Sequence, residues 1–149
     1  MIEIKTRSKR VNLDRWREGS VKVGWFEQTR YGNKASTPVA RVARAHEFGL
    51  GVPRRSFMRP MLRQYGTYFK KRLREQYKEA LQTEKSTEAV LAHLGIDVVG
   101  KIQEAIIAVR EPALAPSTIK RKGHAKPLID THTMINTVNY TIEEHEARK

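Results

Sequence analysis

The chain has 149 residues, of which 39% are hydrophobic and 30% charged, and it contains no cysteine. This length suits one domain with a real hydrophobic core, and the apolar fraction is too high for a wholly disordered chain. The lack of cysteine excludes a disulfide framework and a thiolate metal site. No stretch approaches the ~20 consecutive apolar residues of a membrane span, so we expect one soluble, cytosol-made domain over residues 1–149 with no membrane partner.

The net charge of +13 is distributed unevenly along the chain. Residues 1–85 hold 21 Lys and Arg against 8 Asp and Glu, whereas residues 86–149 hold 8 of each kind. Such asymmetry indicates an acidic partner, which could be nucleic acid, an anionic membrane or an acidic protein surface. The sign of the charge does not choose among them.

Two short strands are predicted near the N-terminus, because apolar and polar residues alternate over residues 2–5 and again over residues 21–25. The segment 28–38 is rich in Gly, Asn, Ser, Thr and Pro, which predicts a mobile loop. We expect that loop to expose Arg30, Tyr31 and Lys34.

Three helices are predicted next. The first runs from Pro38 to a stop at Gly49, and the third runs over residues 87–110, where Gly95 and Gly100 indicate a bend or close packing. The second covers about residues 56–81, because apolar residues recur there at steps of three and four. That apolar stripe comprises Met58, Leu62, Tyr65, Phe69, Leu73, Tyr77 and Ala80.

The flank beside this stripe is a basic face made of Arg63, Lys70, Arg74 and Lys78. These side chains cannot all be buried without partners, so they face water, DNA or an acidic protein. A simple solvated surface and a binding surface are equally good interpretations.

The remainder of the chain completes the predicted fold. Residues 111–127 contain three prolines and the basic run 120–122, which predicts an irregular segment. Residues 135–142 are rich in β-branched side chains, which predicts a final strand. The fold class is therefore α+β, with a small mostly antiparallel sheet packed against two long helices in a single domain.

Chemical motifs are incomplete. Residues 95–101 match the spacing of a phosphate-binding loop, but Ile102 stands where that loop needs a hydroxyl, and the match lies within a helical pattern. His46 and Glu47 begin like a zinc-protease motif, but Leu50 replaces the second histidine. We therefore predict no catalytic site, no cofactor and no metal.

Two blocks carry a resemblance to a known family. The first block, residues 39–60 (VARVARAHEFGLGVPRRSFMRP), and the second block, residues 116–134 (PSTIKRKGHAKPLIDTHTM), resemble signatures of tailed-phage virion-morphogenesis proteins, among them the Mu-like G proteins and related neck proteins. The matching positions are Ala45, His46, Glu47, Phe48, Gly49, Pro53, Arg54 or Arg55, Phe57, Arg59 and Pro60, then Pro116, Thr118, Lys122, Gly123, Pro127, Leu128, Ile129, Asp130 and Thr131. His132 departs from the family's usual Gly, and it would be strained if that position needs a positive φ.

The resemblance implies a structural virion protein, not an enzyme, located in the neck or tail and assembled in the cytoplasm of the host bacterium. Such proteins join the capsid connector to the tail as rings, so the implied partners are further copies, in a hexamer in preference to a dodecamer. Other neck proteins, portal or connector proteins and tail-tube proteins are implied as well.

An interface is predicted between the first two helices, where a Gly- and Pro-containing bend would hold aromatic and arginine side chains in place. Its residues are Phe57, Arg54, Arg55, Arg59, Phe48 and Glu47. Phe57 could equally fill the core of its own domain. The basic face of the second helix would meet an acidic neighbour or line a channel for DNA. In such a channel it would contact the phosphates of the DNA and would not distinguish one base sequence from another. The alternative function is that of a basic nucleic-acid-binding protein.

Overall fold

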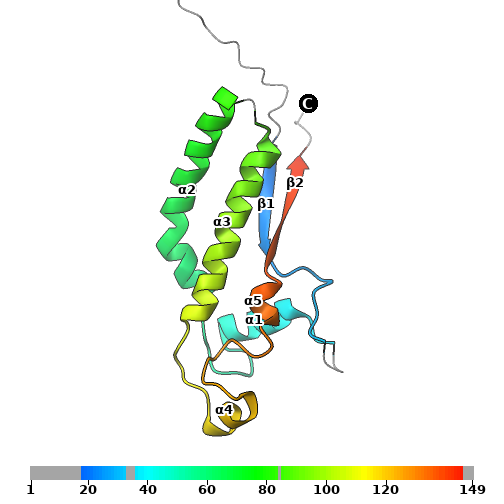
Figure 1. Ribbon diagram of the computed structural model, residues 1–149, viewed down its shortest axis with the longest axis vertical. Coiled ribbons are helices and arrows are strands. Elements are labelled where there is room, and N and C mark those ends of the chain that lie inside the picture. Colours follow the sequence, from blue (N-terminus) through cyan, green and yellow to red (C-terminus); the bar gives the residue numbers. More distant parts are fainter. Residues whose placement is uncertain (1–17, 33–35, 84, 146–149) are drawn as a thin grey trace, which may run out of the picture.

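A computed structural model describes residues 18–32, 36–83 and 85–145. Two long helices, α2 (Met58–Thr83) and α3 (Thr87–Ala108), form an antiparallel hairpin, and a two-stranded sheet of β1 (Glu18–Gly24) and β2 (Asn139–His145) lies beside α3 (Figure 1). Three short helices gather at the other end of the molecule. They are α1 (Val39–Phe48), α4 (Pro116–Lys122) and α5 (Thr133–Asn136).

This architecture confirms the α+β class with a small antiparallel sheet, although the sheet packs mainly against α3 and not against both long helices. A two-stranded sheet is only about 5 Å wide between strand axes, which is enough to cover one helix. Val21 pairs with Ile142 and Val23 with Tyr140 on one face, whereas Lys22 and Glu143 form an ion pair of 2.6 Å on the other.

The predicted strand over residues 21–25 corresponds to β1, and the strand predicted over residues 2–5 lies outside the described residues. The prediction for residues 135–142 was partly wrong, because Ile135 belongs to α5 and the strand begins at Asn139. Pairing sets this limit, since β1 ends at Gly24, which lies opposite Asn139. Among the described residues, no strand lies beside Ile135, and the amides of Asn136 and Thr137 instead donate to the carbonyls of His132 and Thr133 in a helical turn.

The main core lies where α1, α5 and the lower parts of α2 and α3 meet. Its buried members are Val39, Ala43, Phe57, Met61, Phe69, Ile102, Ile106, Leu128, Met134 and Val138. Trp25 closes it: its indole Nε1 donates a 2.8 Å hydrogen bond to the carbonyl of Met134, and its ring meets Phe57 edge-on at 6.0 Å. Segments more than 100 residues apart in the chain are thereby joined.

The apolar stripe predicted for α2 is partly wrong. Phe69 and Ala80 are buried as expected, but Leu62 is half exposed and Met61 is buried in its place. The start of α2 packs on the core around Phe57 as well as on α3. The side of the helix that is buried there therefore contains Met61 in place of its neighbour Leu62.

Close packing was correctly predicted at Gly95 of α3. A Cβ at this position would lie 2.6 Å from two ring carbons of Tyr140, so β2 approaches the helix where the side chain is absent. Around Gly100, by contrast, a Cβ would meet nothing within 4 Å.

Residues 111–127 are not irregular throughout, because they include α4. Pro116 opens this helix and Gly123 closes it in the left-handed conformation, an arrangement that both residue types favour. The segment was misjudged because Pro116 was taken as a breaker and not as a helix start. His132 has φ of 58°, so the position where the family pattern has Gly does take a left-handed backbone.

The predicted exposure of Arg30 is confirmed, but Tyr31 is partly buried against the core, and Lys34 lies outside the described residues. The base of this loop is held by a hydrogen bond of 2.9 Å from the Tyr31 amide to the Thr37 carbonyl. Within the described parts of the chain, none of the helices has the length and apolar character needed to cross a membrane.

Candidate functional site: the junction of the two sequence blocks

The first and second blocks, far apart in the chain, fold against each other. The backbone amide of Arg55 donates to the His46 carbonyl at 2.8 Å, which folds the bend after α1 back on that helix. The Arg55 guanidinium then donates from Nε to the Pro112 carbonyl at 2.8 Å and from Nη2 to the Ala113 carbonyl at 3.1 Å. Arg55 therefore ties the first block to the segment that leads into the second.

Glu47 holds the start of α2. Its Oε2 accepts hydrogen bonds from the amides of Phe57 and Met58 at 2.8 and 3.0 Å. Its Oε1 accepts from Ser56 Oγ at 2.6 Å and from the Arg59 amide and Nε at 3.2 and 3.0 Å. The first amides of a helix have no partner within the helix, and a carboxylate also suits the positive end of the helix dipole. Glu47 thus caps α2 from a neighbouring helix.

The charge of Glu47 is strongly favoured in this position. Burial alone would raise its pKa, but the hydrogen bonds from Ser56, Phe57, Met58 and Arg59 outweigh burial and lower the pKa from 4.5 to about 2. The glutamate of the HEFG sequence is therefore a structural carboxylate.

The predicted interface residues divide into two groups. Phe57, Glu47 and Arg55 are only 2%, 3% and 5% exposed, which favours the core interpretation of Phe57 over the inter-subunit anchor. The sequence reveals the bend but not the side toward which each residue points.

Phe48, Arg54 and Arg59 are exposed, as an interface requires. The Arg59 guanidinium lies over the Phe48 ring, 4.6 Å from its centroid. The exposed apolar side chains continue into the bend with Leu50 and Val52.

A cavity of about 720 Å³ opens between the two blocks. We call it the basic pocket, because Arg55, Arg121, Lys122 and His46 line it and Asp130 is its one acidic residue. Apolar side chains form the rest of the lining, among them Val42, Val52, Leu114, Leu128 and Met134. The Nδ1 atom of His46 is buried there without a hydrogen-bond partner in the described structure.

The basic groups of this pocket act on one another. The pKa of His46 is lowered by burial and by the nearby charges of Arg55 and Lys122. Burial also lowers the pKa of Lys122, and Arg121 and Arg55 lower it further, while Asp130 opposes the shift. The site therefore concentrates positive charge in a partly desolvated place.

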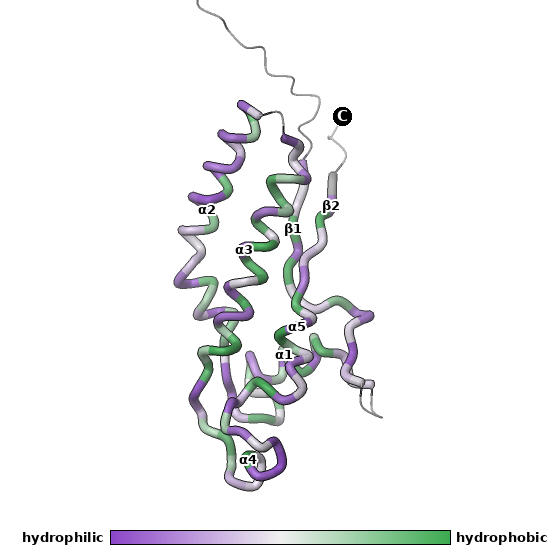
Figure 2. The backbone as a smooth tube through the Cα atoms, viewed as in Figure 1, coloured by the Kyte–Doolittle hydropathy of each residue, from purple (hydrophilic) through white to green (hydrophobic). Residues whose placement is uncertain are grey.

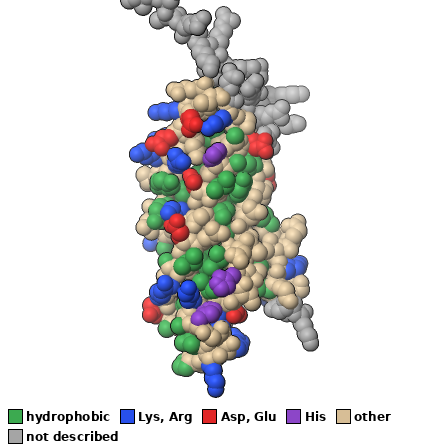
Figure 3. Space-filling model, viewed as in Figure 1, with side chains coloured by type: hydrophobic (Ala, Val, Ile, Leu, Met, Phe, Trp, Pro, Cys, Tyr) green, Lys and Arg blue, Asp and Glu red, His purple; other side chains and the backbone are tan. Residues whose placement is uncertain are grey.

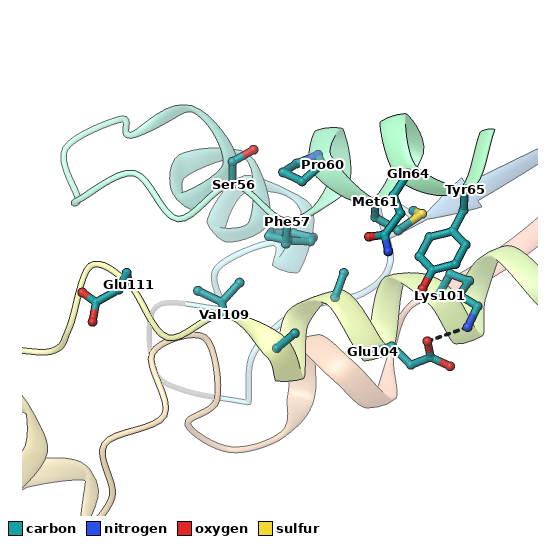
Figure 4. A pocket seen from close by; sticks show the side chains of 12 residues that line it. Ser56, Phe57, Pro60, Met61, Gln64, Tyr65, Lys101, Glu104, Val109 and Glu111 are labelled. Carbon is teal, nitrogen blue, oxygen red and sulfur yellow. Dashed lines mark hydrogen bonds and ion pairs between the residues drawn. The ribbon is translucent and has the colours of Figure 1, made fainter. Parts of the chain in front are cut away.

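A second cavity, of about 510 Å³, lies between the start of α2 and the end of α3 (Figure 4). Phe57, Met61 and Val109 form its apolar part. Lys101 lies 4.8 Å above the Tyr65 ring centroid and pairs with Glu104 at 2.6 Å. Because Lys101 is already paired with Glu104, this cavity offers a weaker attraction for a charged ligand than the basic pocket does.

The basic face of α2 is exposed at all four positions, Arg63, Lys70, Arg74 and Lys78. Among the described residues none of the four has a carboxylate within 4.0 Å, whereas Lys71 and Arg72 on the same helix pair with Glu75 and Asp97. The structure thus places the predicted basic face on the surface, away from the basic pocket.

The outer face of α3 has the opposite character. Ile96 and Ile107 are 58% and 44% exposed. Steps of three and four residues place Ala89, Ala92, Gly100 and Gln103 on this same side. We call this side the uncharged face of α3. Figure 2 shows hydrophobic colour along most of α3 and far less on α2, and Figure 3 shows hydrophobic side chains gathered over α3.

In the described residues no three His, Cys, Asp or Glu side chains gather as they would around a metal ion. The site residues that sequence reasoning missed are His46 and Lys122, which it treated as motif positions and not as members of one pocket. Their presence in two separate signature blocks was the available signal. Comparison of the chain with protein-family models, curated proteins and solved structures finds no match.

Proposed function

We propose that this protein is a structural subunit of a tailed-phage particle that assembles into a ring in the neck or tail and joins the capsid connector to the tail. The observation that carries the proposal is the junction of the two blocks. The two blocks lie some 60 residues apart in the chain. If each block matched its signature by chance, there would be no reason for the matching residues to lie close together in the folded chain. Here Glu47, Arg55 and Lys122 belong to one continuous arrangement.

The basic face of α2 and the uncharged face of α3 are two surfaces of different chemistry, and this difference also supports assembly into a ring. A closed ring is built from heterologous contacts, in which one surface meets a different surface of the next copy. The uncharged face of α3 would serve as a protein contact, because charged residues are depleted at the centre of interfaces. The partners in this proposal are further copies, in a hexamer in preference to a dodecamer, together with portal, connector or tail-tube proteins.

Electron microscopy of the purified protein in negative stain tests the proposal, with rings of uniform size as the expected result. The variant Ile96→Glu should abolish the rings while keeping the helical circular dichroism of the parent. Leu81→Glu is the matched control, since it places the same charge at an exposed apolar residue of α2. If rings persist in Ile96→Glu, the uncharged face is not part of the interface between copies. If the parent protein itself forms no rings, the proposed function is contradicted.

A second candidate is a nucleic-acid-binding protein, favoured by the unpaired cations of the basic face. Contacts with phosphates would be independent of sequence and would weaken steeply with salt. Monomers that retard a DNA duplex at physiological salt would favour this candidate over the ring.

A further inference from the structure

The basic pocket gathers buried and partly buried positive charge. Arg55 is 5% exposed, and arginine is rarely buried without a carboxylate partner. Among the described residues no acidic group lies within 4.0 Å of the charged atoms of Arg55, Arg121 or Lys122. The Arg55 partners are two neutral carbonyls, and Asp130, the one acidic residue of the lining, faces four basic residues without forming an ion pair with any of them in the described structure.

The geometry leaves donors available for a ligand. Lys122 Nζ donates to the carbonyls of Lys126 and Pro127 at 3.1 and 3.3 Å, and an ammonium group has three protons, so one remains. His46 lines the same cavity, and its Nδ1 atom is buried without a hydrogen-bond partner in the described structure, so a small rotation of the ring would be needed to bring that atom to a ligand. An anion in the pocket would compensate the clustered positive charges and accept a hydrogen bond from the remaining proton of Lys122 Nζ.

The surroundings of the pocket indicate which anion. Val42, Leu114 and Met134 make part of the wall apolar, which does not suit a hydrated phosphodiester. Val52, which belongs to the bend after α1, lines the pocket and is 36% exposed, and Leu50 in the same bend is 53% exposed. Exposed apolar side chains around a concave site are typical of protein recognition, whereas nucleic-acid contacts are dominated by polar and basic groups.

We propose that the basic pocket binds a segment of a partner protein that presents an aspartate or glutamate carboxylate beside an apolar side chain. The carboxylate would lie between Lys122 and Arg121, and the apolar side chain would pack against Val52 and Leu114. This inference does not depend on ring formation, because it concerns one pocket within a single chain.

Nuclear magnetic resonance titration of the full chain tests the proposal with two peptides that differ only in charge, acetyl-Leu-Asp-Leu-amide and acetyl-Leu-Asn-Leu-amide. The aspartyl peptide should shift the backbone amides of residues 113–115, 121–123 and 128–130. It should bind about tenfold more tightly than the asparaginyl peptide, the ratio expected of a charge-assisted hydrogen bond.

Lys122→Gln should remove this preference, because the amide keeps a donor for the carbonyls of Lys126 and Pro127 and loses the charge. Arg121→Gln is a second variant, on an exposed side chain that makes no hydrogen bond in the described structure. Lys120→Gln is the matched control, since it lies on the same helix but outside the pocket lining, and it should keep the preference.

Equal binding of the two peptides, or no binding of either, would overturn the proposal. Inorganic phosphate is the third probe, and binding of phosphate as tight as that of the aspartyl peptide would overturn the assignment of a protein ligand in favour of a nucleic-acid backbone. None of these results depends on whether rings form, so failure here is distinguishable from failure of the proposed function.

Discussion

Glu47 concentrates several interactions on one carboxylate, and its effect on stability depends on pH. Because its pKa is about 2 in the folded chain and 4.5 ordinarily, its contribution is complete above about pH 4.5 and is lost as the pH falls toward 2. The shift corresponds to about 3 kcal/mol.

We expect Glu47→Gln to lower the free energy of unfolding at neutral pH by about 3 kcal/mol, because an amide cannot accept all the hydrogen bonds that the carboxylate accepts. The acid-dependent loss of stability between pH 4.5 and 2 should shrink by the same amount. Urea denaturation at several pH values measures both effects. Glu75→Gln is the control, since Glu75 is exposed and forms only a 3.9 Å pair with Lys71. An unchanged acid response in Glu47→Gln would assign that response to other carboxylates.

Phe57 and Phe48 form a matched pair of the same residue type in opposite environments. Phe57→Ala should cost about 3–5 kcal/mol, because it leaves a cavity beside Trp25 and Met61. Phe48→Ala should cost about 1 kcal/mol or less, since the residue is 53% exposed and a cation–π contact such as that with Arg59 contributes little at an exposed site. Thermal unfolding measures the difference. A small effect of Phe57→Ala on the melting temperature would contradict its place in the core.

At the scale of elements, α3 offers two glycines with opposite expected effects. Gly95→Ala should lower stability by about 1–3 kcal/mol, because the new methyl group would overlap the Tyr140 ring and displace β2. Gly100→Ala should raise stability by up to about 1 kcal/mol, since nothing lies within 4 Å and alanine is the better helix former. Denaturant unfolding of both variants decides this, and a stabilised Gly95→Ala would show that the sheet does not press on the helix.

The basic face of α2 allows a test at the same scale. The double variant Arg63→Glu/Arg74→Glu should weaken the binding of a DNA duplex and flatten its dependence on salt, because fewer counterions are released. Arg41→Glu/Arg44→Glu on α1 makes the same change in net charge at another exposed surface, and it should have less effect. Fluorescence anisotropy gives both affinities. Equal losses would mean that only net charge matters, and failure of the α2 variant to form rings would assign this face to a protein contact.

At the scale of the whole molecule, the basic face and the uncharged face lie on different helices, α2 and α3. Within the described ranges, Arg63, Lys70, Arg74 and Lys78 have no carboxylate within 4.0 Å, while the residues of the uncharged face of α3 include no charged side chain. A neighbour that packed on α3 would therefore avoid most of the repulsion expected between copies with a net charge of +13. This separation is the reason that ring assembly and contact with DNA can be tested by different variants.

Local patterns in the sequence determined the elements whose signals are long or strongly periodic. These are the two long helices, the exposed basic face and the alternating strand β1, because helix and strand periodicity depend only on near neighbours. The need for a left-handed residue at His132 was also visible, as a departure from a glycine in the resembling pattern. The tertiary structure alone decided the start of β2, which depends on where β1 ends, and the burial of Phe57, Glu47 and Arg55. It also decided the basic pocket, because His46 and Lys122 become neighbours only when Arg55 ties the first block to the chain leading into the second. Such contacts join residues distant in sequence, and no local spacing encodes them.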